Sequence, residues 1–144
     1  MSIAIQVTFD AADPAALAEF WAQALGYELQ APPAGFASWD EFADSNDIPP
    51  ETRNDLAAVV DPDGTGPRLL FQRVPEGKTV KNRVHLDVNA GGGHGVEYVD
   101  RVDAVDHHVD MLLDHGAKKL QVFGQRGEYW VVMQDPEGNE FCVQ

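Results

Sequence analysis

The stretch that decides the fold is IQVTFDA, residues 5–11, because VHLDVNA, residues 84–90, repeats its pattern. In both stretches apolar and polar residues alternate, which is typical of a strand with one buried face. Superposing the two copies places Gln6 opposite His85, on the polar face of each strand. The apolar face is predicted to consist of Ile3, Ile5, Val7 and Phe9 in the first copy and of Val84, Leu86 and Val88 in the second.

A helix is predicted after each of these strands. The first begins at Asp13 and Pro14, an N-cap residue followed by the proline that suits the first helical position, and ends at Gly26. The second is predicted to begin at Asp103 and to end at Gly116, after a linker at 91–101. The spacing from cap to stop is the same in both helices, which indicates a duplicated unit.

Three further strands are predicted in each half. Two turns, DPDG at 61–64 and DPEG at 135–138, each join two apolar runs as a hairpin would. Each half is therefore a βαβββ unit, and the chain is predicted to be one domain, 1–144, with units 1–74 and 83–144. The predicted strands are 27–31, 56–61 and 68–74 in the first unit and 118–124, 128–134 and 139–144 in the second.

An insertion at 32–55 interrupts the first unit. It is rich in Pro, Asp and Asn and carries Phe36, Trp39 and Phe42, with a short helix predicted at 39–44. Long insertions of this kind often act as lids over a binding site, and Trp39 would then approach a ligand. The alternative is a surface loop whose aromatic side chains cover the edge of the core. The sequence leaves both open.

Composition excludes several classes of function. The net charge of −14 argues against binding to nucleic acid or to anionic membranes and could attract cationic ligands, although acidic surfaces also serve solubility alone. No apolar run has the roughly 20 residues of a membrane span. With one cysteine and no signal-like leader, we expect a cytoplasmic protein.

Three segments in this order resemble the glyoxalase / bleomycin resistance / dioxygenase (vicinal oxygen chelate) superfamily, in its glyoxalase-like branch. They are ADPAALAEFWAQALGYEL at 12–29, KNRVHLDV at 81–88 and DPEGNEFCV at 135–143. The resemblance implies an α+β fold in which duplicated βαβββ units form an open, U-shaped barrel around a cleft. It also implies a homodimer.

The resemblance further implies metal-ligand positions at Gln6, His85 and Cys142, with relatives commonly carrying glutamate at the last. A fourth position falls on Leu70 or Gln72, where no carboxylate stands. Few charged donors remain to offset the removal of a metal ion from water, so we expect no tightly held metal. The alternative is a Zn, Ni, Fe or Mn ion at Gln6, His85 and Cys142, with Glu140 as a further candidate ligand.

Two functions therefore remain open at this point. One is the binding of a small organic molecule, aromatic or cationic, without a cofactor; the other is a metal-dependent lyase or isomerase of the glyoxalase type. His85 is the candidate catalytic residue, with Asp87 placed to influence its imidazole, but it could equally line a pocket. The predicted ligand-binding residues are Gln6, Trp39, Gln72, His85, Trp130 and Cys142.

Overall fold

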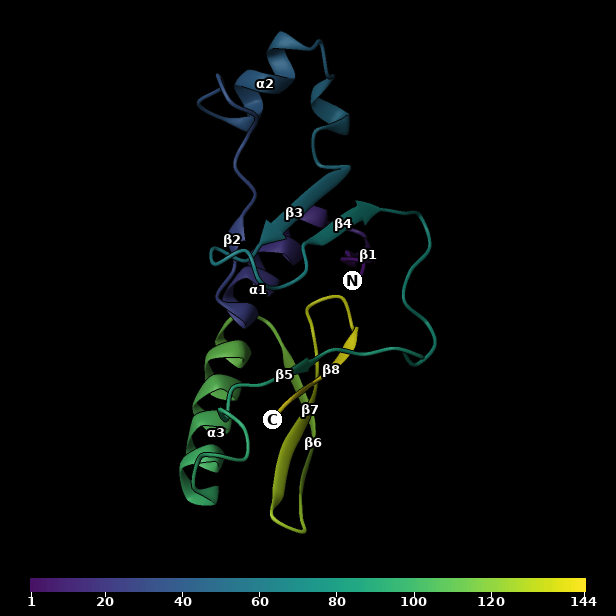
Figure 1. Ribbon diagram of the computed structural model, residues 1–144. Coiled ribbons are helices and arrows are strands. Elements are labelled where there is room, and N and C mark those ends of the chain that lie inside the picture. The colour runs from purple at the N-terminus through teal and green to yellow at the C-terminus, as the bar shows by residue number, and fades with distance from the viewer. The chain divides into compact units, whose positions relative to one another are not determined.

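The computed structural model describes all residues, 1–144, and divides them into two compact units. One comprises 1–22 and 26–77, and the other comprises 23–25 and 78–144. Each unit holds a four-stranded sheet of its own, and the two sheets have equivalent strand orders, β1-β4-β3-β2 and β5-β8-β7-β6 (Figure 1). β1 pairs with β4 in parallel, and β5 pairs with β8 in parallel; all other neighbouring strands in the two sheets are antiparallel. The α+β class and the duplication are therefore confirmed.

The first unit follows the predicted order of elements. Asp13 caps α1 by accepting from the amide of Ala16, and Gly26 ends it with a left-handed φ of 66°. Phe9 of β1 packs on Trp21 of α1 and on Phe71 of β4, with ring centroids 5.1 and 5.2 Å away. The elements are β1 Val7–Ala11, α1 Pro14–Leu25, β2 Glu28–Leu29, α2 Trp39–Ser45, a 3-10 helix Pro50–Thr52, β3 Leu56–Val60 and β4 Leu69–Arg73.

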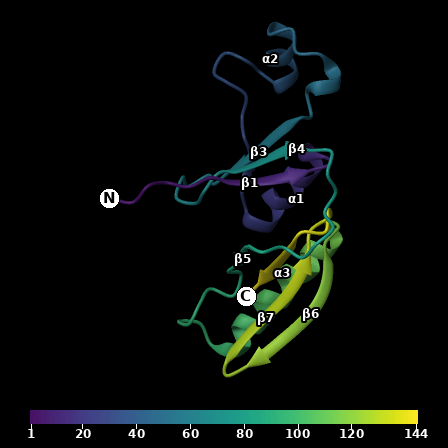
Figure 2. The same cartoon turned by 90° about the vertical axis from the view of Figure 1, so that its right-hand side faces the viewer.

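The second unit places one long helix against one face of its sheet. In Figure 2 this helix, α3, lies behind β6 and β7, so the opposite face of the sheet carries no helix of the unit. The elements are β5 Asp87–Val88, α3 Tyr98–Asp114, β6 Lys118–Gln125, β7 Glu128–Gln134 and β8 Glu140–Val143. The residues buried between helix and sheet are Val105, Val109, Leu112, Val131, Met133, Phe141 and Val143.

The predicted start of the second helix was wrong. It begins at Tyr98 rather than Asp103, so the last residues of the predicted linker 91–101 are helical. Arg101 explains the extension: its guanidinium lies 5.7 Å from the Tyr98 ring and donates to the carbonyl of Gly127 at 2.7 Å. These contacts hold the first turn against the β6–β7 turn, although no side chain caps it.

The predicted first strands were too long. Ile3 is 92% exposed and Ile5 72% exposed, and both precede β1. Strand pairing begins at Val7, opposite Leu69, because β4 itself begins there, two residues after Pro67. In the second copy Val84 is likewise 81% exposed and precedes β5. Alternation alone did not show where the partner strand starts.

The two predicted hairpins are present and are built alike. Gly64 and Gly138 adopt left-handed φ values of 70° and 87°, which a turn at these positions requires. The carboxylate of Asp61 accepts from the amides of residues 63, 65 and 66. These bonds lower the pKa of Asp61 to about 2, and the bond from Gly66 contributes most. Asp135 accepts from the amides of residues 137 and 139 and is 2% exposed. In both turns, DPDG at 61–64 and DPEG at 135–138, the aspartate side chain thus accepts hydrogen bonds from the backbone of the turn.

No helix of the chain has both the length and the apolar composition that crossing a membrane requires. The open barrel around a cleft and the homodimer stay predictions.

Candidate functional site

The candidate site lies on the face of the second sheet that α3 does not cover, called here the helix-free face. Val131, Met133, Phe141 and Val143 point to α3 and are fully buried. Strand alternation then directs the intervening residues to the other side. By strand register, the helix-free face carries Asp87, Lys118, Gln121, Phe123, Gln125, Glu128, Trp130, Val132, Gln134, Glu140 and Cys142. Alternation beyond the ends of β5 and β8 adds His85, Asn89 and Gln144.

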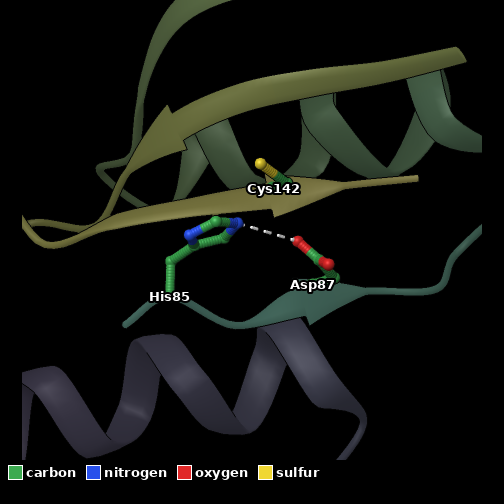
Figure 3. A group of neighbouring side chains, drawn as sticks. All are labelled: His85, Asp87 and Cys142. Carbon is green, nitrogen blue, oxygen red and sulfur yellow. Dashed lines mark ion pairs between the residues drawn. The ribbon is translucent and has the colours of Figure 1, made fainter. Parts of the chain in front are cut away.

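Three side chains of different chemistry meet on this face: His85, Asp87 and Cys142 (Figure 3). Nε2 of His85 lies 3.3 Å from Oδ1 of Asp87, and the ligand atoms of all three residues lie within 4.8 Å of one another. The sequence explains the group locally. His85 stands two residues before Asp87, just ahead of β5, and Asp87 pairs with Cys142 in the parallel register of β5 and β8.

The thiol of Cys142 is held in its neutral form. Burial is the largest cause that raises its pKa, and the negative charge of Asp87 and a hydrogen bond to that carboxylate raise it further. The sulfhydryl therefore donates to Asp87, and the thiolate that nucleophilic chemistry needs is disfavoured at neutral pH. His85 and Asp87 are about half exposed, at 48% and 45% of their side chains.

An aromatic pair stands beside this group on the same face. Phe123 of β6 and Trp130 of β7 are cross-strand partners whose rings stack, with centroids 5.1 Å apart and planes at 14°. Both are partly exposed. Val132, which pairs with Cys142, separates the rings from the His85–Asp87–Cys142 group. One face thus presents a flat apolar surface next to a polar group.

Glu140 has partners of its own. Lys78 forms an ion pair with it at 3.1 Å, and the amide of Asn82 donates to it at 2.9 Å. The hydrogen bond from Asn82, and then the bond from Lys78, lower the pKa of Glu140. The carboxylate thus fastens the segment at 78–82 to β8.

Gln6 and Gln72 lie in the first unit, on the helix-free face of its own sheet. Gln6 accepts from Nη1 of Arg68 at 2.7 Å, and Gln72 donates to Asp10 at 2.9 Å. Whether these two glutamines meet His85 and Cys142, which belong to the second unit, stays a prediction.

Trp39 is 47% exposed at the start of α2, where its indole N–H donates to the carbonyl of Gln30 at 2.7 Å. Its ring packs edge-on against Phe42, which packs edge-on against Phe36, with centroids 5.7 and 5.2 Å apart. The three aromatic residues of the insertion therefore pack on one another. The role of Trp39 as a lid residue stays a prediction.

Sequence reasoning missed two members of the candidate site. Asp87 was expected only to influence the imidazole of His85, yet it also lies within 4.8 Å of the Cys142 sulfur; its position two residues after His85 was the available signal. Phe123 was missed because it becomes a partner of Trp130 only once the register of β6 and β7 is known.

The residues of the His85–Asp87–Cys142 group fit a three-ligand divalent metal site. Imidazole, carboxylate and thiolate all bind zinc, with ligand bonds of about 2.0–2.3 Å. Carboxylate and thiolate together would balance two positive charges. The spread of up to 4.8 Å between ligand atoms would have to contract by roughly 1 Å around an ion with such bonds.

The chain and known proteins were compared in three ways. No curated protein matches it. Among solved structures, a possible glyoxalase from Bacillus cereus is 16% identical, with 100% of this chain and 99% of that one covered and a TM-score of 0.61. The fosfomycin resistance protein FosX of Listeria monocytogenes was solved with Mn(II) and 1S,2S-dihydroxypropylphosphonic acid. It is 9% identical, with 100% of this chain and 90% of that one covered and a TM-score of 0.61.

The bleomycin-binding protein of Streptomyces verticillus, solved with copper(II)-bleomycin, is 16% identical, with 100% of this chain and 96% of that one covered and a TM-score of 0.53. At such identities these structures show a shared fold. The model of the glyoxalase-like domain family matches residues 6–144, nearly the whole chain. This chain therefore belongs to the glyoxalase-like domain family.

Proposed function

We propose that the chain binds a small organic molecule on the helix-free face of the second sheet, and that this binding needs no metal ion. The observation that carries the proposal is the stacked, partly exposed pair of Phe123 and Trp130. Ligand sites combine apolar and aromatic walls with a few polar groups that fix orientation. The aromatic pair supplies the aromatic wall, and the nearby His85–Asp87–Cys142 group supplies the polar groups.

Two features of the site support binding rather than covalent chemistry. The thiol of Cys142 is neutral and donates to Asp87, so the site offers no activated nucleophile. Glu140 is engaged by Lys78 and Asn82, which leaves it poorly placed to act on a ligand. The site thus offers a ligand a ring surface and the half-exposed side chains of His85 and Asp87.

A neutral aromatic probe tests the proposal. Dansylamide, a naphthalene sulfonamide, should bind with a fluorescence increase that Trp130→Ala weakens, because a lost ring contact costs about 1 kcal/mol, or roughly fivefold in Kd. Tyr98→Ala is the matched control, since Tyr98 is an exposed aromatic residue on α3, which covers the opposite face. Absence of binding up to about 1 mM, or equal binding by both variants, would contradict the proposal.

A second candidate function is metal-dependent catalysis of the lyase or isomerase type. The proximity of His85, Asp87 and Cys142 favours it, because these residues would hold the ion. A divalent ion there would supply Lewis acidity for a bound oxygen atom. The chain's own residues would contribute the ligand geometry, and the Phe123–Trp130 pair would orient the organic part of the substrate.

Metal content separates the two candidates. Elemental analysis of protein purified without a histidine tag should find less than stoichiometric zinc, nickel, iron or manganese if the first proposal is right. Titration with Co²⁺ adds a second readout, because a thiolate ligand gives a near-ultraviolet charge-transfer band that Cys142→Ser abolishes. A stoichiometric ion, together with a melting temperature that falls with chelator and recovers with metal, would favour the second candidate.

A further inference from the structure

The helix-free face of the second sheet carries an uneven distribution of charge. Its strand positions hold three carboxylates, Asp87, Glu128 and Glu140. Lys118, which pairs with Gln134, is the basic residue at a strand position of this face. It lies on the edge strand β6, three strands away from β5, and therefore roughly 14 Å or more from Asp87. At this distance, beyond the Debye length of about 8 Å in physiological salt, exposed charges interact weakly.

Two of the three carboxylates have permanent cations as partners. Glu140 pairs with Lys78 at 3.1 Å, and Glu128 lies 3.6 Å from Nη1 of Arg101. Asp87 differs, because its neighbours are the imidazole of His85 at 3.3 Å and the thiol of Cys142. The charge of Lys81 acts on Cys142, but no lysine or arginine forms an ion pair with Asp87, whose side chain is 45% exposed. Asp87 is therefore the carboxylate of this face that forms no ion pair with a lysine or an arginine.

From this asymmetry, and resting on the proposed function, we propose that the ligand is an organic cation with an aromatic part. Its positive group lies at Asp87, and its ring lies on the Phe123–Trp130 pair. The indole of Trp130 adds a face on which a cation is favourable. A neutral or anionic ligand of the same shape would leave Asp87 unpaired or repelled.

The strand register fixes the spacing that such a ligand needs. Asp87 pairs with Cys142, Cys142 pairs with Val132, and Trp130 stands two residues further along β7. Two strand separations of about 4.8 Å and two residues of about 3.4 Å place the backbone positions of Asp87 and Trp130 roughly 12 Å apart. Because side chains that lean toward each other shorten this separation, the ligand needs about 8–12 Å between its positive group and its ring.

Three matched probes test the inference. Dansylcadaverine carries a naphthalene ring and a primary ammonium on a five-carbon tether; its N-acetyl derivative is neutral, and N-dansyl-6-aminohexanoate is anionic. Kd values are measured by fluorescence anisotropy in EDTA, which removes metal, at about 0.15 M salt, which screens distant charges. The cationic probe should bind about two- to fivefold more tightly than the neutral one, the range of a half-exposed ion pair, and the anionic probe should bind most weakly.

Two variants of Asp87 and one control variant assign that preference to one residue. On Asp87→Asn, Kd for the cationic probe should become equal to Kd for the neutral probe, and Asp87→Glu should restore part of the difference. Asp110→Asn makes the same charge change at an exposed position of α3 and should preserve it. Circular dichroism spectra that match the wild type establish that each variant is folded.

The outcomes distinguish this inference from the proposed function. Equal affinity for the cationic and neutral probes, or a preference that survives Asp87→Asn, would overturn the inference while leaving small-molecule binding intact. If none of the probes binds, or if Trp130→Ala has no effect on any of them, both are wrong.

Discussion

Replacing Asp135 by alanine should destabilise the protein strongly. One oxygen of Asp135 accepts from the amides of Glu137 and Asn139 at 2.9 and 3.0 Å, and the other accepts from Nδ2 of Asn139 at 2.8 Å. The residue is 2% exposed, so water reaches these donors poorly after truncation. A hydrogen bond to a charged group contributes about 1.5–3 kcal/mol, and a buried unpaired donor costs about 1–3 kcal/mol. Because the three bonds act together, we expect a loss of about 3 kcal/mol.

The assay is urea denaturation followed by circular dichroism, and Asp61→Ala is the matched control. Asp61 holds the equivalent turn of the first unit with a similar set of bonds, but its surroundings are more exposed to water. The Asp61 variant should therefore lose less stability than the Asp135 variant. A loss below about 1 kcal/mol for Asp135→Ala would refute the reasoning, because surface substitutions alone reach about half that value. Equal losses for both variants would show that burial of the turn does not matter.

Three further predictions follow from individual side chains. Cys142 should react with iodoacetamide more slowly than a free cysteine peptide at neutral pH, because burial and Asp87 raise its pKa, and Asp87→Asn should speed the reaction; a rate equal to that of the peptide would contradict this. Glu140 has a pKa below its usual 4.5, so its contribution to stability is present above that value and is lost as pH falls through the folded-state pKa. Glu140→Gln should therefore flatten the acid limb of a stability–pH curve, and an unchanged limb would be inconsistent with the bonds from Asn82 and Lys78. Gly26→Ala should cost about 1 kcal/mol in urea denaturation because of the left-handed cap, and a neutral result would argue against that conformation.

The sequence predicted those parts of the fold whose signals are local. Asp13, Pro14 and Gly26 fix the ends of α1 through a side-chain cap, a preset φ and a left-handed stop, and the structure confirms all three. The paired DP-G turns were recognisable for the same reason. The start of α3 was not, because Arg101 extends that helix by bonding to Gly127 across the unit. Contacts between segments distant in sequence carry no local signal.

The candidate site shows the same division. Alternation predicted that His85 and Cys142 lie on the polar faces of their strands, and in the structure their side chains lie within 4.8 Å of each other. The importance of Asp87 depended on the parallel pairing of β5 with β8, which no local pattern specifies. The stacking of Phe123 on Trp130 likewise depends on a register that shifts at a bulge between residues 119 and 121.

The central claim, that a small organic molecule binds the helix-free face of the second sheet, is tested most directly by nuclear magnetic resonance. Amide correlation spectra of ¹⁵N-labelled protein are recorded with and without dansylcadaverine. The account predicts the largest shift changes at the indole N–H of Trp130 and at the backbone amides of Asp87 and Cys142. It also predicts little change at exposed positions of α3 such as Asp110. Shift changes confined to α3, or absent from β5, β7 and β8, would contradict it.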